Sequence, residues 1–138
     1  MSWQNVEIVK ASIDAFNRED WDAMLQTAAT DFELDWSRSR GFRRGVYGLD
    51  QVRGFLVEFA ESWESVRVEP GEFIEAGDFV VVPWTTHATG RDGIELVAHS
   101  AFVHEIRGGK IQRISMYQEL QDALEAVGLS EQGAHADP

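Results

Sequence analysis

The sequence predicts an α+β domain in which helices pack on one face of a curved antiparallel sheet. Apolar residues recur at helical spacing in the first half, and the second half consists of β-branched and aromatic segments separated by short glycine-containing links. The 138 residues, 43% of them hydrophobic, suit one domain with a core of its own. We expect this domain to span residues 1–128 and residues 129–138 to form a flexible tail.

Three helices are expected in the first half of the chain and one near its end. Apolar residues on one helical face predict a helix over 3–17, and Asp20 can cap a short second helix, so that an αα-hairpin opens the chain. A third helix is expected with Asp50 as its N-cap, and a last one over about 119–127. Gly54 lies inside the third helix, where a glycine would let another element approach closely.

The strands are predicted from alternation and from β-branched composition. Residues 32–36 alternate with period two, which predicts a short strand with Asp35 facing away from its apolar side chains. Pro83 lacks an N–H, which predicts a bulge or a strand edge at that point. Four further strands, linked as antiparallel hairpins, are expected at 66–76, 79–89, 94–106 and 111–117.

Charge and composition exclude several classes of partner. The chain has 24 acidic and 12 basic residues, a formal net charge of −12, which argues against nucleic acid and anionic membranes. It has no cysteine, which excludes disulfides and thiolate chemistry. Since no apolar run approaches the ~20 residues of a membrane span and no signal peptide opens the chain, a cytoplasmic protein is expected.

Three stretches of the chain carry a family resemblance: residues 15–24, with the pattern Phe-Asn-Arg-x-Asp, residues 32–36, and residues 109–117, with Gly-Lys-Ile-x-Arg…Tyr. They resemble the nuclear transport factor 2-like superfamily, and within it the SnoaL-like branch of polyketide cyclases and ketosteroid isomerase-like proteins. The resemblance implies a cone-shaped sheet closed by three helices, a pocket between them, no cofactor, and a homodimer through the outer sheet face. These patterns mark the fold and not the activity.

By this resemblance, the chain has one of the family's catalytic residues, and other residue types stand at the positions of its partners. In ketosteroid isomerases of this superfamily a general-base Asp lies on the first strand, where Asp35 stands here. Ser12 stands where a Tyr donor is expected, and Ala101 and Phe102 stand where a second acid is expected. The Arg and two Asp of limonene epoxide hydrolases correspond to Trp84, Thr86 and Met116.

Asp35 and His104 are the candidate catalytic residues. A carboxylate against aromatic walls would have a raised pKa and act as a base; the alternative is an exposed strand-end Asp or a cap for the following loop. His104 shares its strand parity with Phe102, so it can point inward as a neutral donor or acceptor. His87 and His99 are expected on the outer face, at a dimer contact, and His135 belongs to the tail. The histidine spacings give no helical zinc motif, so no metal site is expected.

A hydrophobic pocket with a few polar groups is expected to bind the ligand, although ordinary core packing is the alternative for most of its residues. The expected ligand-binding residues are Phe16, Trp36, Tyr47, Phe55, Phe59, Trp63, Trp84, Thr86, Phe102, Met116 and Tyr117. A basic segment with Arg38, Arg40, Arg43 and Arg44 either closes over the pocket and holds an anion or is a solvated loop paired with nearby acids.

Three functions fit this sequence. The first is a cofactor-independent isomerase, cyclase or hydrolase that acts on a small apolar or weakly anionic molecule with Asp35 as its base. The second is a non-catalytic ligand-binding or dimerisation module of the same fold, which the missing partner residues favour. The third is an adaptor that recognises a protein through the outer sheet face.

Overall fold

The computed structural model describes residues 2–40 and 43–129. In chain order the elements are α1 (Ser2–Asn17), α2 (Trp21–Gln26), β1 (Ala28–Asp35), β2 (Val46–Gly48), α3 (Leu49–Glu61), β3 (Ser65–Pro70), β4 (Ile74–Ala76), β5 (Phe79–Thr89), β6 (Glu95–Arg107), β7 (Lys110–Tyr117) and α4 (Leu120–Ala126). The α+β class is confirmed. His135 and nearly all of the expected tail lie outside the described residues.

The strands form one curved, mixed sheet in the order β2-β1-β7-β6-β5-β3, with β4 beside β5. Every neighbouring pair is antiparallel except β1 and β7, which run parallel. The expectation of a wholly antiparallel sheet is wrong at that pair. Parallel strands need a long crossover, and here most of the domain lies between β1 and β7, so no local turn signal announces their pairing.

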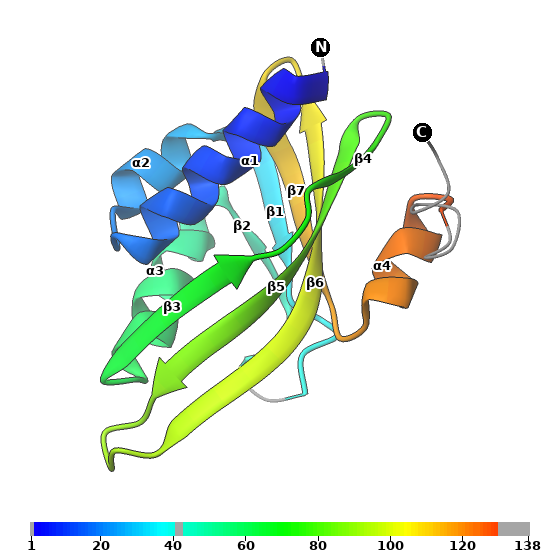
Figure 1. Ribbon diagram of the computed structural model, residues 1–138. Helices are drawn as coiled ribbons and strands as arrows, with labels where there is room; N and C mark the ends of the chain where they lie inside the picture. Colours follow the sequence, from blue (N-terminus) through cyan, green and yellow to red (C-terminus); the bar gives the residue numbers. More distant parts are fainter. Residues whose placement is uncertain (1, 41–42, 130–138) are drawn as a thin grey trace.

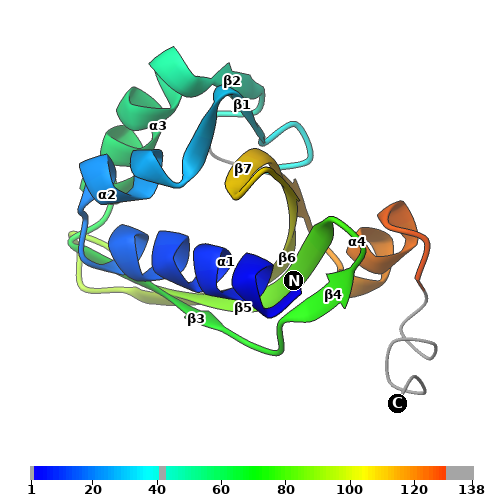
Figure 2. The ribbon, with the colours of Figure 1, turned by 90° about the horizontal axis from the view of Figure 1, so that it is seen from above.

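Helices cover both faces of the sheet. The sheet bends through β7 and β6 around α1, while α2 and α3 lie across the open side and α4 lies outside the curve (Figures 1 and 2). On the concave face, residues such as Val9, Phe55 and Phe102 belong to the main buried cluster. On the convex face, Ala123 and Leu124 of α4 belong to a second, smaller cluster.

A side-chain hydrogen bond marks the start of α2 and another marks the start of α3. Asp20 caps α2 as expected, because its Oδ1 accepts a hydrogen bond from the backbone N–H of Ala23 at 3.1 Å. The expected cap at Asp50 is wrong, since Gly48 is the N-cap of α3 and Asp50 lies in the first turn. The Gln51 carboxamide oxygen accepts from the Gly48 N–H at 3.1 Å, so β2 leads directly into the helix.

Pro83 lies in β5, opposite the break between its two neighbours β3 and β4. The segment expected as one strand over 66–76 is divided into β3 and β4. The Gly71 N–H donates to the Pro83 carbonyl at 2.7 Å. Because the N and the carbonyl of one strand residue point to the same side, the missing N–H of Pro83 faces this break. A strand edge at Pro83 is therefore confirmed, although β5 is otherwise central.

The first half of β6 has a free edge. β5 pairs with β6 from Glu95 to Glu105, whereas β7 pairs with it only from Ala101 onward. No other strand of the described residues pairs with 95–100. The arm formed by β3, β5 and β6 therefore extends beyond β7 (Figure 1). Within the same described ranges, no helix is long and apolar enough to cross a membrane.

Candidate functional site

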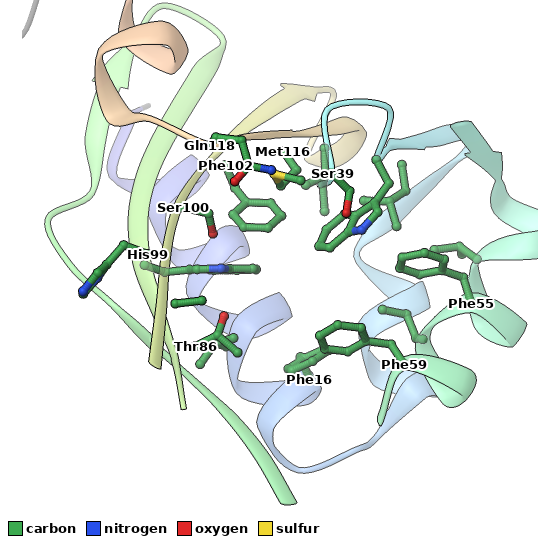
Figure 3. Close-up of a pocket in the computed structure, with 18 of the residues that line it drawn as sticks. Phe16, Ser39, Phe55, Phe59, Thr86, His99, Ser100, Phe102, Met116 and Gln118 are labelled. Carbon is green, nitrogen blue, oxygen red and sulfur yellow. The ribbon is translucent and has the colours of Figure 1, made fainter. Parts of the chain in front are cut away.

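A cavity of about 470 Å³ lies between the concave face of the sheet and the helices. Its wall comes from α1, α2, α3, the strands β1, β3, β5, β6 and β7, and the segment after β1 (Figure 3). The volume is within the range of small-molecule sites. Hydrophobic strand residues of one parity form most of the sheet wall, since alternate side chains of a strand point to the same face.

Aromatic side chains dominate one wall of the cavity. The Trp36 ring centroid lies 5.3 Å from that of Phe55, 6.2 Å from that of Phe59 and 5.6 Å from that of Phe102. The rings of Phe102 and Trp84 are 3.7 Å apart. This aromatic belt of Trp36, Phe55, Phe59, Phe102 and Trp84 joins α3 to β6 and β5, and its fixed rings suit a flat apolar ligand.

Few polar groups line the cavity. Among its lining residues within the described chain there is no Asp or Glu, and Arg40 is the one Lys or Arg. Ser39, Thr86, Ser100 and Gln118 add neutral hydrogen-bonding groups at the wall. His99 also contributes to the wall, but its ring points away from the cavity (Figure 3). The arrangement therefore provides apolar burial together with a few scattered polar contacts.

The structure places nine of the eleven expected ligand-binding residues at this cavity; their role in binding stays a prediction. They are Phe16, Trp36, Phe55, Phe59, Trp63, Trp84, Thr86, Phe102 and Met116. The placement of the two tyrosines is wrong. The Tyr47 hydroxyl donates to the Arg43 carbonyl at 2.6 Å, outside the cavity lining. Tyr117 follows Met116 on the strand and so faces the opposite side, where it packs with the α4 cluster.

Sequence reasoning missed part of the lining. Leu96, Ala98 and Ser100 line the cavity, and they share strand parity with Phe102, so alternation along β6 was the signal that would have found them. Ser39, on the segment after β1, also lines the cavity. No periodic pattern predicts where an irregular segment places its side chains.

Asp35 is buried, 4% exposed, and lies outside the cavity lining. Its Oδ1 accepts from the Ser37 N–H at 3.0 Å and from the Ser37 hydroxyl at 2.6 Å. Its Oδ2 accepts from Arg38 at 3.1 Å and from Arg113 at 2.9 Å. Burial alone would raise the pKa of Asp35, but these hydrogen bonds outweigh it and lower the pKa to about 2. The expected raised pKa is therefore wrong.

The Asp35 carboxylate organises the start of the segment that leads to the cavity. Arg113 bridges Glu33 and Asp35, and the Arg38 guanidinium lies 4.2 Å from the centroid of the Tyr117 ring. Asp35 binds Ser37 and Arg38, the two residues that directly precede Ser39. This network holds the backbone that carries Ser39 and Arg40 to the cavity wall. It makes Asp35 a structural anchor in the geometry observed.

His104 shares the concave face with Phe102 but does not line the cavity. Its neighbours across the sheet are Val80 and Ile114, and its Nδ1 lies 3.3 Å from the Val80 carbonyl. Burial lowers the pKa of His104 to about 4, a shift that the hydrogen bond to Val80 partly opposes. His104 is therefore a neutral core histidine at neutral pH. Asp35 lies on the opposite face, in register with Ser115, so the two candidate catalytic residues are not brought together.

The other described histidines and two of the arginines contact polar side chains of the protein, whereas Arg40 lines the cavity. His87 Nε2 lies 2.9 Å from Glu69, and His99 Nδ1 lies 3.1 Å from the Thr85 hydroxyl, both on the outer face as expected. In the arginine segment, Arg38 pairs with Asp35 and Arg43 pairs with Glu58, whereas Arg40 lines the cavity. Arg38 and Arg43 therefore fit the interpretation of a loop paired with nearby acids, whereas anion binding by the segment stays a prediction.

Comparison with solved structures identifies the fold. TerC, crystallised with polyporic acid, is 25% identical over 90% of this chain and 97% of its own, with a TM-score of 0.75. An NTF2-like protein of unknown function from Burkholderia pseudomallei is 23% identical over 91% of this chain and 98% of its own, also with a TM-score of 0.75. A candidate polyketide cyclase from Xanthomonas campestris is 24% identical over 92% of this chain and 98% of its own, with a TM-score of 0.70.

Sequence comparison gives the family. Among curated proteins, none matches the chain. The family model of the SnoaL-like domain matches residues 9–114, which include α2, α3 and most of the sheet. With that match over more than half of its length, on the fold that the solved structures share, the chain belongs to the SnoaL-like domain family.

Proposed function

We propose that the protein binds a small, largely apolar molecule with flat rings in the cavity between the sheet and the helices. The observation that carries the proposal is the aromatic belt around a volume of about 470 Å³. Burying apolar ligand surface against such a wall contributes roughly 25 cal/mol per Å². The crystallisation of TerC with polyporic acid supports a small-molecule ligand for this chain as well.

Binding without chemistry is favoured over catalysis by the position of the acids. A carboxylate with a pKa of about 2, paired with Arg38 and Arg113, is a weak base at neutral pH. Asp35 also lies outside the cavity lining, and no other acid of the described chain lines it. The competing proposal is a cofactor-independent isomerase, cyclase or hydrolase with Asp35 as its base.

A neutral fluorescent dye tests the binding proposal. N-phenyl-1-naphthylamine becomes bright in apolar surroundings, and we expect it to bind the wild-type protein with one site per chain. Ala98→Trp fills the cavity from β6 and should weaken this binding at least tenfold. Asp14→Trp places the same side chain on the exposed face of α1, outside the cavity lining, and is the matched control.

Two outcomes would count against this proposal. Equal weakening by Ala98→Trp and Asp14→Trp would mean that the dye binds outside the cavity. Isomerisation of a β,γ-unsaturated ketone by the wild-type protein, lost in Asp35→Asn while dye binding is retained, would favour the catalytic proposal. The absorbance of the conjugated ketone product reports that reaction.

We also propose a homodimer through the outer face of β5 and β6. The α4 cluster covers one end of this face, at Val81, Ala101 and Val103. The other end is open, and Val97 there is 56% exposed. We expect a second copy of the chain to cover this open end, so that the apolar surface of the outer face continues across the contact.

A further inference from the structure

We infer that the ligand of the cavity is an anion: an apolar ring compound with an acidic group that pairs with Arg40 and an oxygen that accepts a hydrogen bond from Trp36. This inference rests on the proposed function, because it concerns the same cavity. It adds the charge of the ligand and the place of its polar atoms. Two separate features of the wall support it.

The first feature is the charge of the cavity wall. The protein has a formal net charge of −12, yet Arg40 is the one Lys or Arg among the lining residues of the described chain, and no Asp or Glu lines the cavity beside it. The described lining of the cavity therefore carries a positive charge, opposite in sign to the net charge of the protein. An anion that reaches Arg40 from the cavity meets no carboxylate in the described wall.

The neighbouring arginines are already paired with acids of the protein. Arg38 and Arg113 pair with Asp35 at 3.1 and 2.9 Å, and Arg43 pairs with Glu58 at 2.5 Å. Within residues 2–40 and 43–129 the structure records no ion pair or hydrogen bond for the Arg40 guanidinium. Arg40 is exposed at the cavity, and no described residue occupies its donors. A guanidinium in that state suits the two oxygens of a carboxylate or a similar anion.

The second feature is an unpaired donor in the wall. Trp36 Nε1 is buried and has no hydrogen-bond partner in the described part of the chain. Buried polar groups in native proteins almost always have a partner, and one without it indicates a missing acceptor. The Trp36 ring is held by Phe55, Phe59 and Phe102, so its N–H direction is fixed. A ligand oxygen that reaches this N–H supplies the acceptor.

The two donors lie on one short segment, Trp36 at the start of a hydrogen-bonded turn and Arg40 directly after it. The backbone N–H of Ser39 donates to the Trp36 carbonyl at 3.2 Å, and the backbone N–H of Trp36 donates to the Gly45 carbonyl at 2.8 Å. Asp35 holds the intervening Ser37 and Arg38. Trp36 and Arg40 therefore reach the cavity from the same short segment. Trp36 belongs to the aromatic belt, and Arg40 lines the cavity next to Ser39. A flat molecule seated on the belt presents its oxygens to this segment.

A matched pair of dyes tests the charge preference. The dye 1-anilinonaphthalene-8-sulfonate has the skeleton of N-phenyl-1-naphthylamine with one added sulfonate, so the two differ in the anionic group. Isothermal titration at one ionic strength measures both affinities. We expect the wild-type protein to bind the sulfonate more tightly than the neutral dye. Arg40→Gln should weaken the sulfonate about tenfold and change the neutral dye less than twofold.

Two further variants separate local pairing from general effects. Arg44→Gln removes the same charge from the same segment, but Arg44 does not line the cavity, and both affinities should stay within twofold of wild type. Trp36→Phe keeps an aromatic ring and removes the N–H, and it should weaken the sulfonate more than the neutral dye. Ala98→Trp should weaken both dyes, which ties them to the cavity.

The outcomes separate this inference from the proposed function. If neither dye binds the wild-type protein, the proposed function and the inference both fail. If the neutral dye binds in the cavity but the sulfonate binds no more tightly, the inference alone fails. It also fails if Arg40→Gln and Arg44→Gln weaken the sulfonate equally, because the effect would then come from net charge and not from the cavity wall.

Discussion

Asp35 illustrates how hydrogen bonding decides the state of a buried carboxylate. The side chain is almost fully buried, which by itself favours the protonated form. Four donor contacts from Ser37, Arg38 and Arg113 reverse that preference. Strand alternation predicts which way Asp35 points, but Arg113 lies 78 residues further along the chain. No local pattern reveals that partner, and without it a raised pKa is the natural expectation.

The lowered pKa of Asp35 makes its contribution to stability depend on pH. The folded-state pKa is about 2 against 3.8 for the free group, so the unfolded chain binds the proton more readily. The contribution is therefore present above about pH 4 and lost as the pH falls toward 2. We expect Asp35→Asn to lower the free energy of unfolding at pH 7 by about 2 kcal/mol, since one pKa unit corresponds to about 1.4 kcal/mol.

Urea unfolding of both proteins between pH 7 and pH 3 measures this difference. The gap between wild type and Asp35→Asn should narrow as the pH falls below 4. The lowered folded-state pKa of His104 also makes stability depend on pH. That contribution is lost as the pH falls from 6.5 to about 4, a range above the one for Asp35. It is present in both proteins, so its effect cancels in the difference. A gap that stays constant across the range would contradict the assigned role of Asp35.

At the scale of elements, local signals predict helices and hairpins well and non-local pairing poorly. The hairpins β5–β6 and β6–β7 follow from their glycine turns and β-branched strands. The short strand β2 and the parallel pair β1–β7 depend on contacts between distant segments. The aromatic residues of α3 follow from helical spacing, and for that reason the helical wall of the cavity was predictable.

Within α3, Gly54 is a position where a substitution can raise the stability of the protein. It lies within α3, and a Cβ built there meets no atom within 4 Å. The close approach expected from the sequence is therefore wrong. Gly54→Ala should raise the free energy of unfolding by about 0.5–1 kcal/mol, because alanine restricts the unfolded chain and suits a helix. Urea unfolding at pH 7 measures it.

Gly77→Ala is the matched control for this substitution. A Cβ at Gly77 also meets no atom within 4 Å, but its φ is +60°, a conformation that favours glycine. The same substitution should therefore destabilise the protein at Gly77 and stabilise it at Gly54. Changes of the same sign at both sites would mean that free space, and not backbone conformation, controls the outcome.

At the scale of the whole molecule, the fold constrains chemistry only weakly. The SnoaL-like fold is shared by neighbours with different descriptions, among them a candidate polyketide cyclase and a protein of unknown function. In this chain the concave face and its cavity follow from strand parity and helix periodicity. The charge of the cavity does not, because Arg40 lies on an irregular segment whose path is set by tertiary contacts.

The proposed dimer makes a prediction at this scale. Val97→Glu places a charge at the open end of the outer face and should convert the wild-type dimer into a monomer, because a charge buried in an apolar contact is costly. Sedimentation equilibrium measures the mass. Trp3→Glu changes a side chain of similar exposure on α1, away from this face, and should leave the dimer intact. A monomeric wild-type protein would refute the proposal.

The free edge of β6 has a consequence for the proposed ligand binding. The aromatic belt is attached to the main core, whereas Leu96 and Ala98 lie on an arm that β5 supports on one side only. A wall tethered along one edge bends without breaking hydrogen bonds to a second neighbour. Under the proposed function, we expect the end of the cavity at the aromatic belt to select ligands by shape and the end at Leu96 and Ala98 to accept ligands of different length.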